Sequence, residues 1–207
     1  FLNNNNELWL YLNYGGDNWV RFILVKEFLV DGPITQTNTL RLAVNTLKSN
    51  PEKFVTGIYR RYGLIENWDT SLITDMSGLF KDDLTFNKDL SGWNVRNVTD
   101  MSEMFKNCRL FNHNLYWVVS SCLNMEKMFD DCQSLSQQNI LNSDNVTNFR
   151  DMFRNCILLD TVELDCSAGR DLSGMFNYVG SSLLPGDELV VILTNTSNAT
   201  DMSNMFS

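Results

Sequence analysis

A six-residue pattern, Asx-Met-x-x-Met-Phe with small variations, recurs six times in this chain and constrains its fold more than any other feature. The copies begin at Asp75, Asp100, Asn124, Asn148, Asp171 and Asp201. Their closing phenylalanines are spaced 25, 24, 24, 23 and 30 residues apart. A period of about 20 to 50 residues is typical of repeat proteins, in which stacked units share one core. The sequence therefore predicts a repeat architecture.

Each position of the pattern has a physical interpretation. An Asx residue is a favoured helix N-cap, because its side-chain oxygen accepts a hydrogen bond from a free amide of the first turn. Apolar residues at the first, fourth, fifth and eighth positions after the Asx form one face of a short helix. We therefore predict helix N-caps at Asp75, Asp100, Asn124, Asn148, Asp171 and Asp201. The predicted core side chains are Met76, Phe80, Met101, Met104, Phe105, Met125, Met128, Phe129, Met152, Phe153, Met175, Phe176, Met202 and Phe206.

A second apolar cluster precedes each predicted helix. Trp68, Trp93 and Trp117 each lie eight residues before the first methionine position, and Leu189–Leu193 has the composition of a strand. A strand and a short helix cannot bury an apolar face alone, whereas stacked copies can. The predicted fold class is an α/β repeat, a right-handed, leucine-rich-repeat-like solenoid of short strands and short helices. It would comprise about six repeats over residues 64–207, with further repeats expected beyond the last residue.

Residues 1–63 are predicted to form an N-terminal α+β cap, because the end of a solenoid exposes an apolar cross-section that needs a cover. Two strand-like runs, Leu8–Tyr14 and Trp19–Val30, flank a glycine-rich turn and predict a β-hairpin. Apolar residues at helical spacing within Leu40–Leu47 predict a first helix, and Asn50–Tyr62 predicts a second helix that begins with a proline. The cap would therefore hold a hairpin and two helices.

Composition excludes several classes of function. The net charge is −9, and the acidic excess falls on the repeats, which disfavours general binding of nucleic acid. No apolar run approaches the roughly 18 residues of a membrane-spanning helix. The single histidine, His113, has no recognisable catalytic partner, and the nucleotide-binding, nucleophile-elbow and zinc-protease motifs are absent from the sequence. We predict no catalytic, cofactor-binding or metal-binding residue, no cofactor and no small-molecule substrate.

Three cysteines, Cys108, Cys132 and Cys156, occupy the same position in successive repeats. A disulfide needs Cα atoms within about 7 Å, whereas neighbouring helices lie about 8–10 Å apart. The pattern therefore predicts three buried free thiols and assembly in a reducing compartment. Cys122 and Cys166 lie near predicted strands, where a pairing is the alternative.

The residues of the first repeats resemble a known family. Trp68–Phe80 and Phe86–Met101 are similar to the repeat of BspA-like leucine-rich surface proteins, also called the 25-residue Mycoplasma-lipoprotein repeat. The resemblance covers residues 64–207, and later units drift, with Leu141 and Leu164 in the tryptophan position. Such repeats occur in bacterial surface proteins and lipoproteins, in protists, and in large DNA viruses that infect protists. The resemblance supplies no catalytic residues.

These observations favour a non-catalytic structural or protein–protein interaction protein. The expected setting is an assembled particle, such as the virion of a large DNA virus, in which the chain is a minor capsid protein assembled in the host cytoplasm. Its partners would be neighbouring capsid proteins. The alternative is a cell-surface adhesin or lipoprotein that binds a host or neighbouring-cell protein. A third interpretation is an enzyme with its site in residues 1–63.

Overall fold

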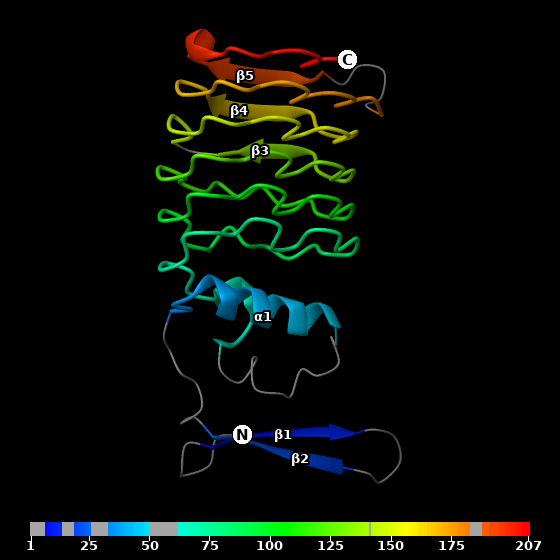
Figure 1. The fold of residues 1–207 in the computed structure, drawn as a ribbon. Coiled ribbons are helices and arrows are strands. Elements are labelled where there is room, and N and C mark those ends of the chain that lie inside the picture. The colour runs from blue at the N-terminus through cyan, green and yellow to red at the C-terminus, as the bar shows by residue number, and fades with distance from the viewer. Residues whose placement is uncertain (1–6, 14–18, 26–32, 50–61, 141, 183–187) are drawn as a thin grey trace.

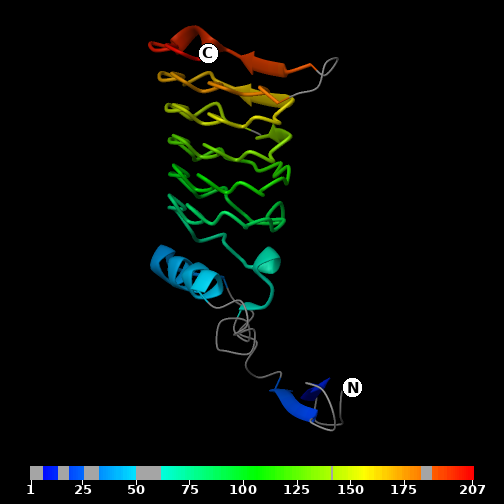
Figure 2. The same ribbon diagram turned by 90° about the vertical axis from the view of Figure 1, so that its right-hand side faces the viewer.

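The computed structural model describes residues 7–13, 19–25, 33–49, 62–140, 142–182 and 188–207. The described residues from 62 onward wind into a stack of flat coils, one above another, which Figures 1 and 2 show from two directions. We number the coils 1 to 6 after the Asx residue that each contains: Asp75, Asp100, Asn124, Asn148, Asp171 and Asp201. Parallel β-bridges join each of these residues to the next, so one position of the repeat runs straight along the stack.

Hydrogen bonds continue from coil to coil on one side of each bridge. In coil 1 the amides of Met76, Gly78 and Phe80 donate to backbone carbonyls of coil 2 over 2.8–2.9 Å. The same alternation recurs between the later coils. In this segment the donating amides all face the next coil, and the accepting carbonyls all face the previous one. The segment therefore has a donor edge toward the C-terminal end of the stack and an acceptor edge toward the N-terminal end.

The segments that follow the Asx residues are chains of tight turns, and the predicted short helices are not present there. The amide of Leu79 donates to the carbonyl of Met76, three residues back, at 3.2 Å. The third and seventh positions after the Asx have left-handed backbone, as at Glu103 (φ 55°) and Asn107 (φ 63°). Left-handed residues interrupt a right-handed helix, and the alternate amides are bonded to the next coil. The inward-facing positions are the predicted ones, because consecutive turns also bring every third or fourth residue to the same side.

The prediction of helix N-caps at the six Asx residues is accordingly wrong, because no helix follows them. The predicted hydrogen bond from a following backbone amide to the Asx side chain is nevertheless present. Each Asx oxygen accepts the amide two residues ahead, over 2.7–3.1 Å, which is the geometry of an Asx turn. The residues concerned are Asp75, Asp100, Asn124, Asn148, Asp171 and Asp201. The side chain therefore shapes the corner at which each coil begins its series of turns.

The opposite side of the later coils forms a parallel sheet. Strands β3 (Gln137–Asn139), β4 (Thr161–Asp165) and β5 (Val190–Thr194) lie side by side in this order. Along β4 the side chains alternate, with Val162 and Leu164 buried and Glu163 exposed. Short 3-10 turns, η2 (Ile65–Asn67) and η3 (Thr196–Asn198), complete coils 1 and 6. The handedness of the coils and their relation to leucine-rich repeats stay predictions.

A stack of six phenylalanine rings runs through the core. Successive ring centroids lie 5.4–5.7 Å apart, with planes within 10° of parallel. The rings are those of Phe80, Phe105, Phe129, Phe153, Phe176 and Phe206. The methionines of the pattern are buried beside them in coils 1 to 5.

Coil 6 departs from the predicted core. Met202 is 48% exposed and Phe206 is 61% exposed, although both were predicted to be buried. Only Met205 of this copy is buried. The reason is geometric, because each coil's apolar side chains are covered by the coil that follows, and within the described residues nothing follows coil 6.

The tryptophans fix the strand side of the first coils. The ring nitrogen of Trp93 donates to the carbonyl of Ile65 at 2.7 Å, and that of Trp117 donates to the carbonyl of Leu90 at 2.9 Å. Both rings are buried, and each buried ring nitrogen has its hydrogen-bond acceptor in the preceding coil. Leu141, predicted in the same position, lies outside the described residues.

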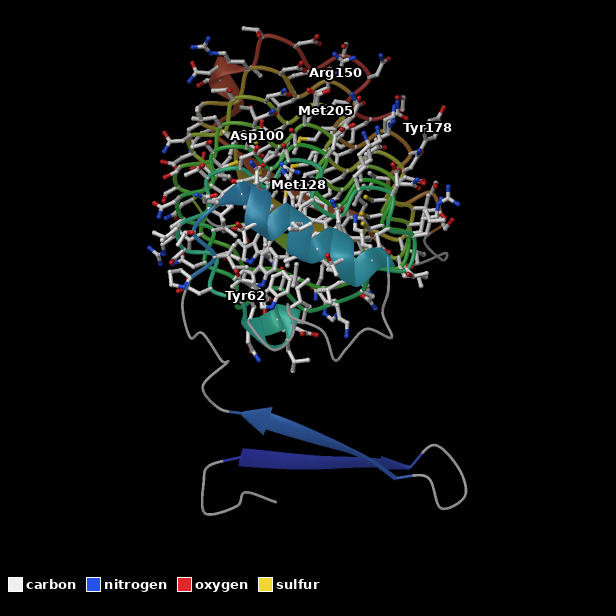
Figure 3. All side chains as sticks on the ribbon, turned by 60° about the horizontal axis from the view of Figure 1, so that its bottom comes forward. Tyr62, Asp100, Met128, Arg150, Tyr178 and Met205 are labelled. Carbon is white, nitrogen blue, oxygen red and sulfur yellow. The ribbon has the colours of Figure 1, made fainter. Side chains whose placement is uncertain are left out.

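The N-terminal part contains a hairpin and a helix, as predicted. Strands β1 (Glu7–Asn13) and β2 (Trp19–Val25) pair antiparallel, and helix α1 spans Thr37–Ser49. The second helix, predicted over Asn50–Tyr62, falls almost wholly outside the described residues. Helix α1 lies across the end of the stack, as Figure 3 shows from below, with Leu40, Ala43 and Val44 buried in the common core.

Two cations of α1 meet the acceptor edge of coil 1. Arg41 donates to the carbonyl of Ser77 at 2.5 Å, and Lys48 donates to the carbonyls of Leu79 and Lys81 at 3.2 and 3.4 Å. These carbonyls occupy the positions that accept amides from the preceding coil elsewhere in the stack. Helix α1 therefore covers both the apolar end and the free backbone edge of coil 1.

Candidate interaction surface

The side of the stack built from the Asx turns, which we call the turn face, carries a row of alternating charges. It comprises the side chains at the second, third, sixth and seventh positions after each Asx. Lys81 pairs with Glu103 at 2.7 Å, and Glu103 also contacts Lys106 at 3.2 Å. Lys106 lies 3.6 Å from Asp130, which pairs with Arg154 at 2.7 Å. The row thus crosses coils 1 to 4, and each charge in it has an oppositely charged neighbour.

Asp130 is the most buried charge of the turn face. Its side chain is 2% exposed. Arg154 donates from Nε to one carboxylate oxygen at 2.9 Å and from Nη2 to the other at 2.7 Å. The hydrogen bond to Asp130 raises the pKa of Arg154. Hydrogen bonds from Lys81 and then Lys106 lower the pKa of the Glu103 carboxyl. These charges are held by one another, so the turn face has little charge left to offer a partner.

The acidic excess of the repeats lies outside the turn face. Asp69, Asp89, Asp144, Glu163 and Glu188 are exposed, and none of them makes an ion pair with another described residue. The backbone amide of Ser91 donates to Asp89 and lowers the pKa of that carboxyl, so it keeps its charge into mildly acidic conditions. A rigid surface with unpaired carboxylates favours a partner with a basic surface.

The cysteine column is part of the core. Cys108, Cys132 and Cys156 are fully buried, and the structure has all five cysteines unpaired and buried, Cys122 and Cys166 included. Each thiol of the column donates to the carbonyl of a phenylalanine one coil back, at 3.1 Å. Burial raises the pKa of the Cys108 thiol to about 12. The thiols are therefore protonated packing groups with little nucleophilic character.

A pocket of about 280 Å³ opens between α1 and coil 1. Val44, Leu47, Phe80 and Phe86 give it apolar walls, and Lys48 lies at its side. Burial lowers the pKa of Lys48, although nearby carboxylates oppose the shift. Within the described residues, no three histidine, cysteine or acidic side chains converge as metal ligands. Among the same residues, no helix has the length and apolar character to span a membrane.

Sequence reasoning missed the most specific polar contacts, those of Arg41 and Lys48. The signal for them was present, because two cations seven residues apart lie on the helix face that also carries Leu40, Val44 and Leu47. The single histidine, His113, is half-buried with its ring 6.0 Å from that of Phe111. Its ring therefore packs beside a core ring.

Comparison with known proteins identifies the repeat region. A family model described as "Mycoplasma protein of unknown function, DUF285" matches residues 58–142 and, a second time, residues 139–207. Searches of curated proteins and of solved structures returned no significant match. The two matched ranges together contain all six coils, so the match covers the whole stack described above.

Proposed function

Because the chain belongs to the DUF285 family of Mycoplasma proteins of unknown function, we propose a role that its repeats themselves can perform. The proposed role is that of a non-catalytic structural and protein–protein interaction module. The observation that carries the proposal is the continuous phenylalanine stack, which makes the coils one body with a long outer surface. We further propose that the repeats are of the BspA-like type and that the stack is a right-handed, leucine-rich-repeat-like solenoid.

The exposed carboxylates supply the binding chemistry of this proposal. Asp89 and Glu163 lie outside the turn face and have no cationic partner among the described residues. Carboxylates on a rigid frame accelerate encounter with a basic protein surface and select its orientation. The partner is therefore a protein with clustered lysines or arginines, and nucleic acid is disfavoured by charge.

The proposed setting is an assembled particle, with the chain as a minor capsid protein of a large DNA virus. The five buried, unpaired thiols support assembly in a reducing compartment such as a host cytoplasm. The second candidate is a surface adhesin or lipoprotein, which the match to a Mycoplasma family favours.

A carbodiimide cross-linking experiment on the native protein tests the proposal, because this reagent joins carboxylates directly to lysines. We expect cross-links from Asp89 or Glu163 to lysines of a particle neighbour. Changing Asp69 and Asp89 to Asn and Glu163 to Gln should remove these cross-links. Asp131→Asn is the matched control and should leave them in place, because Asp131 lies on the turn face and is paired with Arg109. Cross-links to a membrane-exposed receptor would select the surface role. If the native protein forms no cross-link to another protein and an activity assay shows that it converts a small molecule, both the particle role and the surface role are overturned.

A further inference from the structure

The pocket between α1 and coil 1 is a cavity that the proposed interaction role does not use. Its volume is about 280 Å³, and its walls include the apolar side chains of Val44, Leu47, Ile65, Phe80 and Phe86. A water molecule occupies about 30 Å³ of liquid, so this volume equals that of about nine waters. A ligand of about ten non-hydrogen atoms therefore fits, which is the lower end of the size range of small-molecule sites.

Asp83 interrupts the repeat pattern at this pocket. In coils 2, 3 and 4 the eighth position after the Asx is a buried cysteine: Cys108, Cys132 and Cys156. Coil 1 has Asp83 in this position, where the side chain is half-buried and lines the pocket. Its carboxylate accepts the hydroxyl of Thr85 at 3.3 Å and forms no ion pair with another described residue. A charge at a position that packs apolar groups elsewhere in the stack is typical of a functional site.

Lys48 brings the opposite charge to the same pocket. Its ammonium donates to the carbonyls of Leu79 and Lys81 at 3.2 and 3.4 Å, so one of its three N–H groups has no acceptor in the described structure. The ammonium lies 5.9 Å from the centre of the Phe80 ring, which forms part of the apolar wall. An anion in the pocket therefore finds a partly dehydrated cation with a free donor.

The two charges are close but not paired. Burial lowers the pKa of Lys48, and the carboxylate of Asp83 opposes this shift, so the two groups interact electrostatically. They form no ion pair with each other, whereas the other two charges that line the pocket, Glu66 and Lys88, pair at 3.5 Å. The pocket thus offers one donor and one acceptor of opposite charge beside an apolar cavity.

We propose that this pocket binds a free α-amino acid with an apolar side chain, of about the size of leucine or phenylalanine. The apolar side chain occupies the cavity, the α-carboxylate accepts a hydrogen bond from Lys48, and the α-ammonium donates one to Asp83. A ligand with a single charge would leave one of the two half-buried groups without a partner, which costs binding free energy. The ligand is bound and not converted, so this site goes beyond the proposed interaction role.

The test is isothermal titration calorimetry on the 207-residue chain. We expect L-phenylalanine and L-leucine to bind with dissociation constants below about 1 mM. The analogue 3-phenylpropanoate lacks the ammonium of phenylalanine, and 2-phenylethylamine lacks its carboxylate. Each should bind at least about tenfold more weakly than phenylalanine, because each loses one charged hydrogen bond. If the chain binds neither amino acid, or binds either analogue as tightly as phenylalanine, the proposal is wrong.

Two variants assign the charges to their residues. Asp83→Asn should abolish the preference for phenylalanine over 3-phenylpropanoate and leave the affinity for 3-phenylpropanoate unchanged. Asp82→Asn is the matched control, because Asp82 is the neighbouring carboxylate, is exposed and does not line the pocket. Lys48→Met should likewise abolish the preference over 2-phenylethylamine.

Asp83→Asn is the deciding variant, because Lys48 also bonds coil 1 and its loss can displace α1. A full preference for phenylalanine that persists in Asp83→Asn would place the amino acid elsewhere on the chain and overturn the proposal. None of these probes or variants involves Asp89 or Glu163, so failure here is distinct from failure of the cross-linking test.

Discussion

The rings of Phe105 and Phe129 lie 5.5 Å apart and only 3° from parallel, although the residues are 24 positions apart in sequence. Both side chains are fully buried, and each ring has a further ring on its other side. This pair shows how one repeat position becomes a continuous core. It also shows that an interior ring has two stacking partners, whereas Phe206 has one.

The first prediction follows from that difference. Phe129→Ala should lower the free energy of unfolding by about 3–5 kcal/mol, because it opens a cavity between two rings that cannot collapse together. In the 207-residue chain, Phe206→Ala, the same change in coil 6, should cost less than half as much, since this ring is already 61% exposed. Urea unfolding followed by tryptophan fluorescence measures both. Equal losses would show that the stack does not contribute as the ring geometry indicates.

The ring stack could be predicted from the sequence, but the backbone that presents it could not. The repeat period fixes which residues meet, so Phe105 and Phe129 follow from spacing alone. Apolar residues at the first, fourth, fifth and eighth positions fit a helix and also fit a series of turns. Gly78 and Gly174 distinguished the two, because glycine is unfavourable inside a helix and favoured at positive φ, where both residues lie (58° and 63°).

The contacts of the candidate surface were harder to predict for the same reason. Arg41 and Lys48 bind backbone carbonyls that are free only because the turns of coil 1 place them on one edge. A helix in that position would have used those carbonyls itself. The exposure of Met202 and Phe206 likewise depends on which coil covers them, and the repeat pattern gives both the same apolar identity as their buried counterparts.

A second prediction concerns the Asx turn. The Asp171 carboxylate accepts the amide of Ser173 at 2.9 Å and its hydroxyl at 2.6 Å. Asp171→Ala should lower the free energy of unfolding by about 0.5–1.5 kcal/mol, because the amide loses its acceptor. Asp171→Asn should recover most of this loss, since Asn124 and Asn148 make the same bond in their coils. If the amide variant were as unstable as the alanine variant in urea unfolding, charge rather than the turn would explain the effect.

A third prediction concerns the buried ion pair of the turn face. Arg154→Met should lower the free energy of unfolding by about 3–5 kcal/mol at neutral pH, because Asp130 stays buried and loses its bidentate partner. Arg150→Met is the matched control, since Arg150 is 54% exposed and contacts Asp151 at 3.7 Å; it should change stability by less than about 0.5 kcal/mol.

A double variant separates the lost pair from lost packing in this experiment. In Arg154→Met the buried Asp130 carboxylate keeps only Lys106, 3.6 Å away, as a cationic partner. Adding Asp130→Asn removes this poorly paired charge, so it should restore part of the lost stability. Chemical unfolding of the unmodified chain, Arg154→Met, the double variant and the control Arg150→Met provides the comparison. A double variant no more stable than Arg154→Met alone would indicate that the arginine acts through packing and that its pairing with Asp130 contributes little.

A fourth prediction links the buried thiols to the pH dependence of stability. Burial raises the pKa of Cys108, Cys122 and Cys166 from 9.0 to about 12. Burial also raises the pKa of Cys132 and Cys156. Above about pH 9 the unfolded chain releases thiol protons that the native chain retains. The native state then binds more protons, so the free energy of unfolding falls as pH rises from about 9 to about 12 and is unaffected by these groups below that window.

Cys108, Cys122 and Cys166 each contribute about 1.4 kcal/mol per pH unit within this window, because that is the free energy of one pKa unit. Cys122→Ala should therefore make the decrease in the free energy of unfolding with pH less steep by about 1.4 kcal/mol per pH unit, the contribution of one proton. Urea unfolding at a series of pH values measures this slope. Ellman's reagent at pH 8 gives an independent reading. All five cysteines should resist it in the native protein and react together once the chain is unfolded, because the reagent requires an accessible thiolate. A thiol that reacts rapidly in the native state would show that its coil opens locally, and its contribution to the pH slope should then be missing.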